Sequence, residues 1–117
     1  MNPRFRFEMA GGVYHVTNRG VDRRDIVSDD IDRQKWLYCL GDAATRYGWR
    51  VFAYALLTNH FHVFLRTPEP NLSVGMQKFE GRYALFFNRR QERRGHRRGK
   101  CVQRERVRAN LEMSRAG

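Results

Sequence analysis

One segment, residues 51–65, constrains the fold of this chain more than any other. Its first seven residues, Val-Phe-Ala-Tyr-Ala-Leu-Leu, are apolar throughout and too few for a buried helix. A Thr-Asn pair then allows a tight turn before a second run, His-Phe-His-Val-Phe-Leu. The segment therefore predicts an antiparallel β-hairpin.

The second run of this hairpin places two histidines close together. Successive side chains of a strand point to opposite faces, so His60 and His62 share one face while Phe61, Val63 and Leu65 share the other. The three apolar residues predict the core face. On the accessible face, two imidazoles two residues apart can converge on one divalent ion. We therefore take His60 and His62 as candidate metal ligands, the alternative being a purely structural pair.

The rest of the chain predicts further strands and two helices. Residues 12–18 are rich in β-branched and aromatic types and predict a strand, which a polar turn at 19–24 follows. A first helix is predicted from a cap at 28–30 to Gly48, with these apolar positions: Ile31, Trp36, Leu37, Leu40, Ala44 and Tyr47. A second helix is predicted from a cap at Asn71 or Ser73 to about Arg90, with these apolar positions: Leu72, Met76, Phe79, Tyr83, Phe86 and Phe87. One more strand fits within 100–108.

The order strand, helix, strand, strand, helix and optional strand predicts the fold class. It is α+β and ferredoxin-like (RRM-like), an antiparallel sheet with helices on one face and the other face open for a ligand. With 117 residues, one hydrophobic core is expected. We expect residues 1–96 to form this domain and residues 97–117 to form a basic tail that holds at most one strand and is otherwise disordered.

The charge of the chain points to nucleic acid as its partner. Lys and Arg number 23 against 12 Asp and Glu, a net charge of +11, and all but three of the basic residues are arginine. The planar guanidinium group matches phosphate geometry, although many surface arginines are merely solvated. The candidate phosphate contacts are Arg23, Arg24, Arg82, Arg89, Arg90, Arg93 and Arg94.

The remaining composition favours the cytoplasm. Cys39 and Cys101 lie far apart and show no metal-ligand spacing, which is typical of a reducing compartment. The sequence shows neither a signal peptide nor an apolar stretch long enough to span a membrane. We therefore expect a cytoplasmic protein.

The hairpin and its surroundings resemble a known family. The run Leu-Leu-Thr-Asn-His-Phe-His-Val-Phe-Leu-Arg-Thr is similar to the HUH motif, two histidines flanking a bulky apolar residue, of the IS200-like insertion-sequence and repeat-associated tyrosine transposases. Segments at 12–20, 71–73 and 81–90 are similar to the family in the same order. The resemblance covers roughly residues 5–98.

This resemblance implies a metal-assisted transesterification on single-stranded or hairpin DNA. His60 and His62, with a third ligand that the motif does not identify, would bind Mg²⁺ or Mn²⁺. A tyrosine would attack the scissile phosphate, giving a 5′-phosphotyrosine and a free 3′-OH. Relatives that lend their tyrosine helix to a partner act as dimers, so a homodimer is one expected arrangement.

The chain departs from the family pattern at the nucleophile. Relatives carry their tyrosine downstream in a stretch resembling Tyr-Ile-x-x-Asn-Pro-Val, whereas this sequence has no tyrosine after Tyr83. Tyr83 is the fallback nucleophile, but it falls in an apolar helical stripe that is typical of a core. His15 is interpreted as a structural or surface residue rather than a ligand.

Three hypotheses follow. The first is an active transposase, and the second is a DNA-binding remnant that cannot cleave because of a truncated or frameshifted end. The third is an RNA-binding protein of the same fold, whose sheet stacks bases on aromatic side chains. The missing nucleophile favours the second hypothesis over the first, and the histidine pair disfavours the third.

Overall fold

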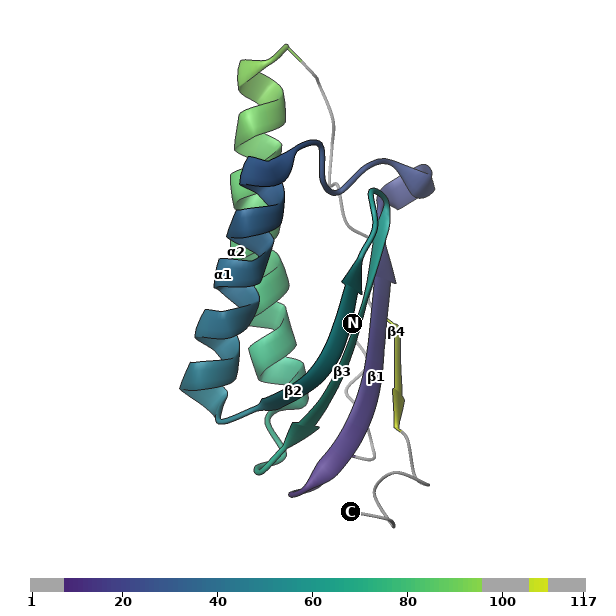
Figure 1. The fold of residues 1–117 in the computed structure, drawn as a ribbon, viewed down its shortest axis with the longest axis vertical. Coiled ribbons are helices and arrows are strands. Elements are labelled where there is room, and N and C mark those ends of the chain that lie inside the picture. Colours follow the sequence, from purple (N-terminus) through teal and green to yellow (C-terminus); the bar gives the residue numbers. More distant parts are fainter. Residues whose placement is uncertain (1–7, 96–105, 110–117) are drawn as a thin grey trace.

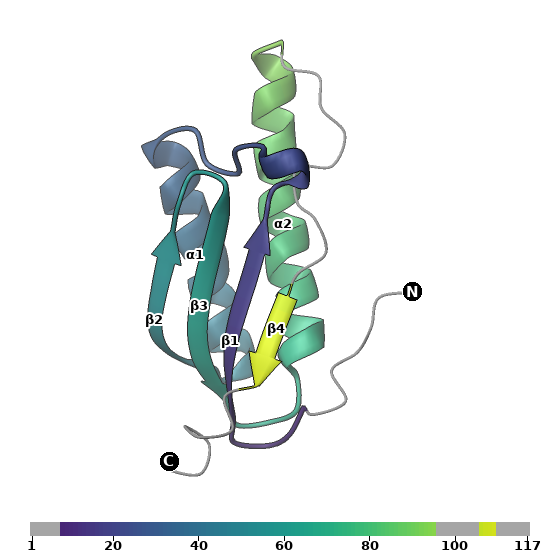
Figure 2. The ribbon, with the colours of Figure 1, turned by 90° about the vertical axis from the view of Figure 1, so that its right-hand side faces the viewer.

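The protein is a layer of helices against an antiparallel sheet. In the part of the chain that our computed structural model describes, residues 8–95 and 106–109, two helices cover one side of a four-stranded sheet (Figure 1). The sheet order is β2-β3-β1-β4, as Figure 2 shows, so β3 and β1 are its inner strands. Along the chain the elements are β1 (Gly12–Arg19), the short 3-10 helix η1 (Val21–Arg23), α1 (Asp30–Tyr47), β2 (Arg50–Leu56), β3 (His60–Thr67), α2 (Leu72–Arg93) and β4 (Arg106–Ala109).

This architecture confirms the α+β, ferredoxin-like fold class predicted from the sequence. The predicted hairpin is present, and its histidine strand lies inside the sheet between β2 and β1. Helix α2 continues three residues beyond the predicted end near Arg90, to Arg93. Strand β4 overlaps the predicted strand at 100–108 only at its end, and residues 100–105 lie outside the described part of the chain.

Local signals explain where the first helix begins and ends. The side chain of Asp29 accepts a hydrogen bond from the backbone N–H of Asp32 at 3.0 Å, which satisfies an amide that the helix itself leaves unpaired. At the other end Gly48 adopts a left-handed conformation with φ of 73°, which a residue without a side chain adopts at little cost. None of the described helices is long and apolar enough to cross a lipid bilayer.

The core lies between the sheet and the two helices. Trp36 of α1 is its centre, with ring centroids 5.4 Å from Phe61 of β3 and 5.5 Å from Phe79 of α2. At the far end of the helices, the ring of Trp49 packs so closely on Gly75 that a Cβ there would lie 2.1 Å from the indole. Both tryptophans therefore lie on the helix side of the sheet.

The packing side of α1 differs from the predicted one at two of its six positions. Ile31 is 57% exposed and Leu37 is 38% exposed, although both were placed among the packing positions. The buried stripe instead includes Asp32, which is fully buried because its carboxylate accepts hydrogen bonds from the backbone N–H and the hydroxyl of Ser28 and from Arg90. A pattern built on apolar residues alone could not include it.

Strand register decides what shares the open side of the sheet. In the β1–β3 pair, His15 lies opposite Phe64, Thr17 opposite His62, and Arg19 opposite His60. The polar residues of β1 and β3 thus meet on the side of the sheet that the helices leave open.

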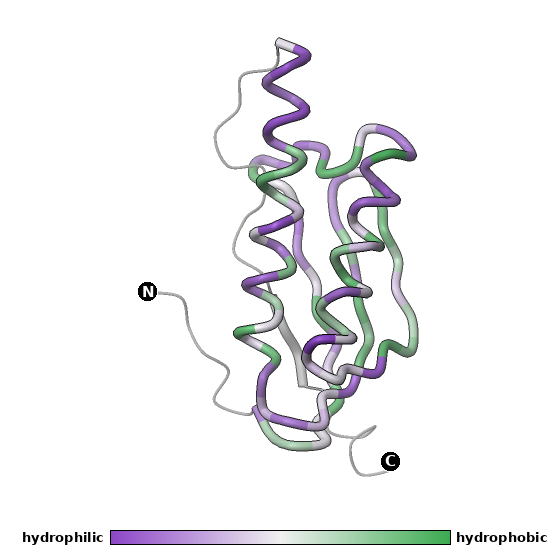
Figure 3. The backbone as a smooth tube through the Cα atoms, turned by 90° about the vertical axis from the view of Figure 1, so that its left-hand side faces the viewer, coloured by the Kyte–Doolittle hydropathy of each residue, from purple (hydrophilic) through white to green (hydrophobic). Residues whose placement is uncertain are grey.

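The C-terminal end of α2 extends beyond the sheet. Hydrophilic residues dominate this end of the helix, as Figure 3 shows.

Candidate functional site

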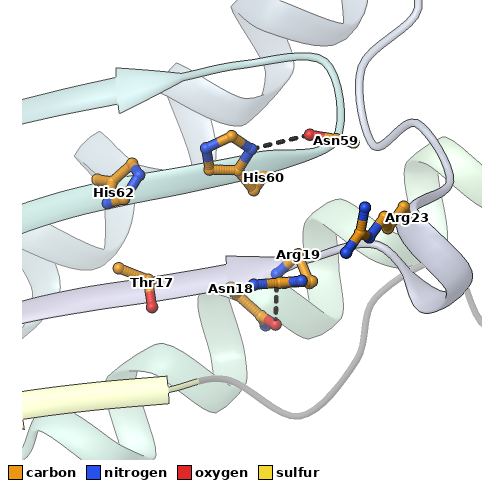
Figure 4. A pocket seen from close by; sticks show the side chains of 7 residues that line it. All are labelled: Thr17, Asn18, Arg19, Arg23, Asn59, His60 and His62. Atoms are coloured by element: carbon orange, nitrogen blue, oxygen red, sulfur yellow. Dashed lines mark hydrogen bonds between the residues drawn. The ribbon is translucent and has the colours of Figure 1, made fainter.

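The two histidines open into a pocket at one end of the sheet, where β1 passes into η1 and the β2–β3 turn approaches it (Figure 4). The cavity has a volume of about 370 Å³. It is lined by Thr17, Asn18, Arg19, Arg23, Asn59, His60 and His62. The structure therefore places both predicted metal ligands in one polar cavity.

Backbone hydrogen bonds hold the walls of this pocket together. The N–H of Gly20 donates to the carbonyl of Asn59 at 2.9 Å, and the N–H of Ile26 donates to the carbonyl of Thr58 at 2.6 Å. The hairpin turn would otherwise leave these carbonyls to water, so the loop after β1 satisfies them and is fixed against the turn. The Thr-Asn turn thus positions both the histidine strand and the loop that carries Arg23.

His60 is fixed by its neighbour in sequence. Its Nδ1 lies 2.8 Å from the side-chain oxygen of Asn59. An amide oxygen only accepts hydrogen bonds, so Nδ1 of His60 carries the proton and, in the neutral ring, Nε2 keeps its lone pair. A histidine that binds a metal usually has its second nitrogen engaged in this way.

His62 is fixed by the adjacent strand. Its Nδ1 lies 3.0 Å from Nε2 of His15 on β1. The ring centroids of His60 and His62 are 5.1 Å apart and their planes make an angle of 81°. Each ring therefore has its δ nitrogen occupied, which leaves the two ε nitrogens as the ligands available for an ion.

The two ε nitrogens suit a divalent ion that is bound by two imidazole ligands. Among the described residues, no three His, Cys, Asp or Glu side chains are grouped so that they could hold a metal. His15 does not complete such a group, because its ε nitrogen is directed at His62 rather than into the pocket. Within the described part of the chain, a third ligand to such an ion would be an amide oxygen, supplemented by water or a phosphate oxygen.

Two arginines flank the histidines. Arg23 was predicted from the basic turn, whereas Arg19, which lies opposite His60, was missed because the predicted strand ended at residue 18. Extending the alternation of His15 and Thr17 by two residues would have found it. Figure 4 shows both side chains at the end where β1 passes into η1. The predicted Arg24 follows η1 and does not line the pocket.

The other predicted phosphate contacts lie in the helical layer. Four of them line a second cavity of about 300 Å³ between α1 and α2, and its lining is Lys35, Arg82, Leu85, Phe86, Arg89, Arg90 and Arg93. The structure therefore separates Arg23, at the histidine pocket, from the four arginines that line this second cavity.

Carboxylates already bind three of the helical arginines. Arg82 lies 2.6 Å from Asp42, and Arg90 and Arg94 lie 2.8 and 2.9 Å from Asp29. The guanidinium of Arg90 hydrogen-bonds to Asp29 and holds the pKa of that carboxyl well below its usual range. Of the arginines on α2, Arg89 and Arg93 are thus better placed than these three to meet an added anion.

The tyrosines do not face the histidines. All five lie within the described residues, and none lines the histidine pocket. Tyr83, the fallback nucleophile, is 3% exposed, and its hydroxyl donates to the backbone carbonyl of Ile26 in the core. Burial also raises the pKa of Tyr14, which is 1% exposed.

Comparisons with known proteins identify a matching family model and solved structures of similar fold. A family model described as IS200-like transposase matches residues 9–104. Among solved structures, the fold is similar to that of a REP-associated tyrosine transposase bound to a REP hairpin, with a TM-score of 0.69 and 16% identity over 99% of this chain and 67% of that one. A protein of Deinococcus radiodurans R1 assigned as a transposase gives a TM-score of 0.68 and 19% identity over 97% of this chain and 90% of that one. No curated protein sequence matches the chain.

Proposed function

This chain belongs to the family of IS200-like transposases, and from that premise we propose that its histidine pocket is a metal-binding site for acting on single-stranded or hairpin DNA. The family assignment confirms the resemblance found in the sequence. The observation that carries the proposal is the pair of imidazoles whose δ nitrogens are both engaged while they line one cavity beside Arg19 and Arg23.

Each side chain has a defined task in this proposal. His60 and His62 would hold Mg²⁺ or Mn²⁺ through their ε nitrogens, and the ion would neutralise charge on a phosphate of the bound strand. Arg19 and Arg23 contact neighbouring phosphates of the strand. Their guanidinium groups donate to phosphate in a fixed, planar geometry, which positions the backbone without reading the bases.

A hairpin is the DNA form that the comparisons favour. The similar REP-associated transposase is bound to a REP hairpin, and its fold matches nearly the whole of this chain. We propose that Arg23 and Arg24 contact DNA on the sheet side of the molecule. Arg82, Arg89, Arg90, Arg93 and Arg94 are proposed as a second set of contacts along α2, with Arg89 and Arg93 the main contributors.

One observation favours a second candidate function, DNA binding without cleavage. A transesterification of this kind needs a nucleophilic hydroxyl beside the phosphate. None of the five tyrosines lines the histidine pocket, and the hydroxyl of Tyr83 is bonded within the core. We propose that the 117-residue chain by itself binds metal and DNA but forms no phosphotyrosine. A homodimer of the chain stays a prediction, as does the boundary between the domain and a basic tail at residues 96–97.

The metal and DNA assignments are tested by separate variants. Replacing both His60 and His62 by Ala should abolish Mn²⁺ binding measured by titration calorimetry, yet leave most of the affinity for a labelled DNA hairpin. Arg23→Ala should leave Mn²⁺ affinity unchanged and weaken hairpin binding, and it should reduce the magnitude of the slope of log affinity against log salt by about 0.7 if it removes one single-strand phosphate contact. Unchanged Mn²⁺ affinity in the double histidine variant would refute the proposed site.

Cleavage is tested by looking for the covalent intermediate. The chain is incubated with a 3′-labelled hairpin and Mn²⁺, because a 5′-phosphotyrosine would link the protein to the downstream fragment, and the products are separated under denaturing conditions. We expect no protein–DNA adduct. An adduct that persists in Tyr83→Phe but disappears in the double histidine variant would show that another tyrosine reaches the pocket, and the binding-only function would be rejected.

A further inference from the structure

His15 has no part in the functions proposed above, yet it is in direct contact with one of the proposed metal ligands. We propose that His15 is a positioning residue that keeps His62 in the one tautomer, protonated at Nδ1, whose ε nitrogen can bind the ion. The inference rests on the proposed metal site and assigns that site a partner on a different strand. The sequence offered no such signal, because residues 15 and 62 are far apart in the chain.

The geometry of the contact suits an imidazole–imidazole hydrogen bond. Nε2 of His15 lies 3.0 Å from Nδ1 of His62, and the two rings are inclined by only 25°. With the ring centroids 5.2 Å apart, this small angle places the two nitrogens between the rings, so that the N–H of one ring points at the lone pair of the other. His15 also packs edge-on against Phe64, with ring centroids 6.4 Å apart, which limits its rotation. Both histidines are half-buried, so water competes weakly for this bond.

The tautomer argument follows from which nitrogen carries the proton. Two bare lone pairs at this distance would repel, so one of the two nitrogens must donate. When Nδ1 of His62 donates, Nε2 of His62 is unprotonated and can bind a metal. In the opposite arrangement a neutral His62 carries its proton on Nε2 and cannot. An acceptor held at the position of His15 Nε2 therefore favours the binding-competent form of His62.

Each proposed ligand thus has its Nδ1 engaged by a hydrogen-bond partner, but the two partners come from different parts of the chain. His60 donates to Asn59, its neighbour in sequence, whereas His62 meets a residue of β1. A metal ligand oriented by a hydrogen-bonded partner typically loses 10- to 100-fold in affinity when that partner is removed. We therefore expect His15 to affect metal binding without touching the metal.

Three substitutions separate the hydrogen bond from mere packing. The side-chain oxygen of Gln reaches about as far as Nε2 of histidine, whereas that of Asn reaches only as far as Nδ1. His15→Ala and His15→Asn should weaken Mn²⁺ binding by about 10- to 100-fold, and His15→Gln should stay within a few-fold of the wild type. Affinity is measured by titration calorimetry without DNA, and thermal unfolding of each variant confirms that it is folded.

A second measurement reads the tautomer directly and needs no metal. Long-range proton–nitrogen NMR spectra of the metal-free chain should show His62 protonated at Nδ1 in the wild type and in His15→Gln. A mixture of tautomers is expected in His15→Ala. Wild-type Mn²⁺ affinity in His15→Ala, or equal losses in the Gln and Ala variants, would overturn the proposal.

The same data distinguish a failure of the metal site from a failure of this inference. If the wild-type chain binds no Mn²⁺, or if removing His60 and His62 leaves binding unchanged, the proposed function fails. An unchanged His62 tautomer in His15→Ala would instead refute the role of His15, whatever the metal does.

Discussion

The two sides of strand β3 are built from alternate residues and are held in different ways. Inward, Phe61, Val63 and Leu65 are each at most 2% exposed and pack beneath the helices. Outward, His60 and His62 are half-buried and are held by single hydrogen bonds to Asn59 and His15. The inward side depends on filling a volume, and the outward side depends on particular atoms. Stability and site chemistry should therefore respond to different substitutions in the same eight-residue strand.

The largest expected effect is the difference in unfolding free energy between two substitutions on opposite faces of β3. Leu65→Ala removes a side chain that is 0% exposed, and it should cost about 2–5 kcal/mol of unfolding free energy through lost burial and the cavity it leaves. Phe64→Ala, next to it on the outward side, should cost roughly 1 kcal/mol, because Phe64 is half-buried and packs on Phe52 and His15 rather than in the core. Urea unfolding at neutral pH measures both. Similar losses for the two variants would show that the open side contributes to the core.

A smaller effect is expected on helix α2, where the same comparison between a packed and an open side is made with two glycines. One glycine faces the core and the other faces solvent. Gly75 faces Trp49, so Gly75→Ala should destabilise the protein by about 1–3 kcal/mol through overpacking. Gly81 is exposed, with no atom within 4 Å of a Cβ built there, so Gly81→Ala should stabilise it by about 0.5–1 kcal/mol through helix propensity. Thermal unfolding distinguishes them by sign. A gain from Gly75→Ala would contradict the close approach of Trp49.

The smallest expected effect concerns the charges beside the N-terminus of α1. Asp29 has a lowered pKa in the folded protein, mainly because Arg90 hydrogen-bonds to it. A lowered folded-state pKa stabilises the protein above the usual Asp pKa of about 3.9, and this contribution is lost as the pH falls through the folded-state value. Asp29→Asn keeps an N-cap and removes the charge.

The measured quantity is the difference in unfolding temperature between the wild type and Asp29→Asn, followed as a function of pH. The wild type should unfold at a higher temperature than Asp29→Asn at pH 7, and the gap should narrow as the pH drops below about 4. Asp30→Asn, in the same turn and exposed, is the matched control. A gap that is constant from pH 7 to pH 3 would mean that the charge of Asp29 does not contribute.

The order of elements and the two faces of β3 could be predicted because they follow from local periodicity. Alternation placed Phe61 and Val63 inward and both histidines outward, and the structure agrees. Local signals also placed the ends of α1, since Asp29 and Gly48 act within one turn of the helix.

What could not be predicted depends on contacts between distant residues. His15 meets His62 only because of the register of β1 on β3, and Asp32 is buried only because Arg90 and Ser28 satisfy its carboxylate. The arginines were predicted as phosphate contacts from the basic composition, but Arg82 and Arg90 on α2 and Arg94 at its C-cap are paired with Asp42 or Asp29. Composition gives the total charge and not which charges remain available for a ligand.

The positions of the two tryptophans determine which events the intrinsic fluorescence of this protein can detect. Trp36 is 1% exposed in the core and Trp49 is 6% exposed beside α2, so neither lines the histidine pocket. Intrinsic fluorescence should therefore follow unfolding and remain nearly silent when an oligonucleotide occupies the open side of the sheet. Phe64→Trp would place a tryptophan on the same face of β3 as His62, two residues away. Its fluorescence should be quenched when bases of a bound oligonucleotide stack on it.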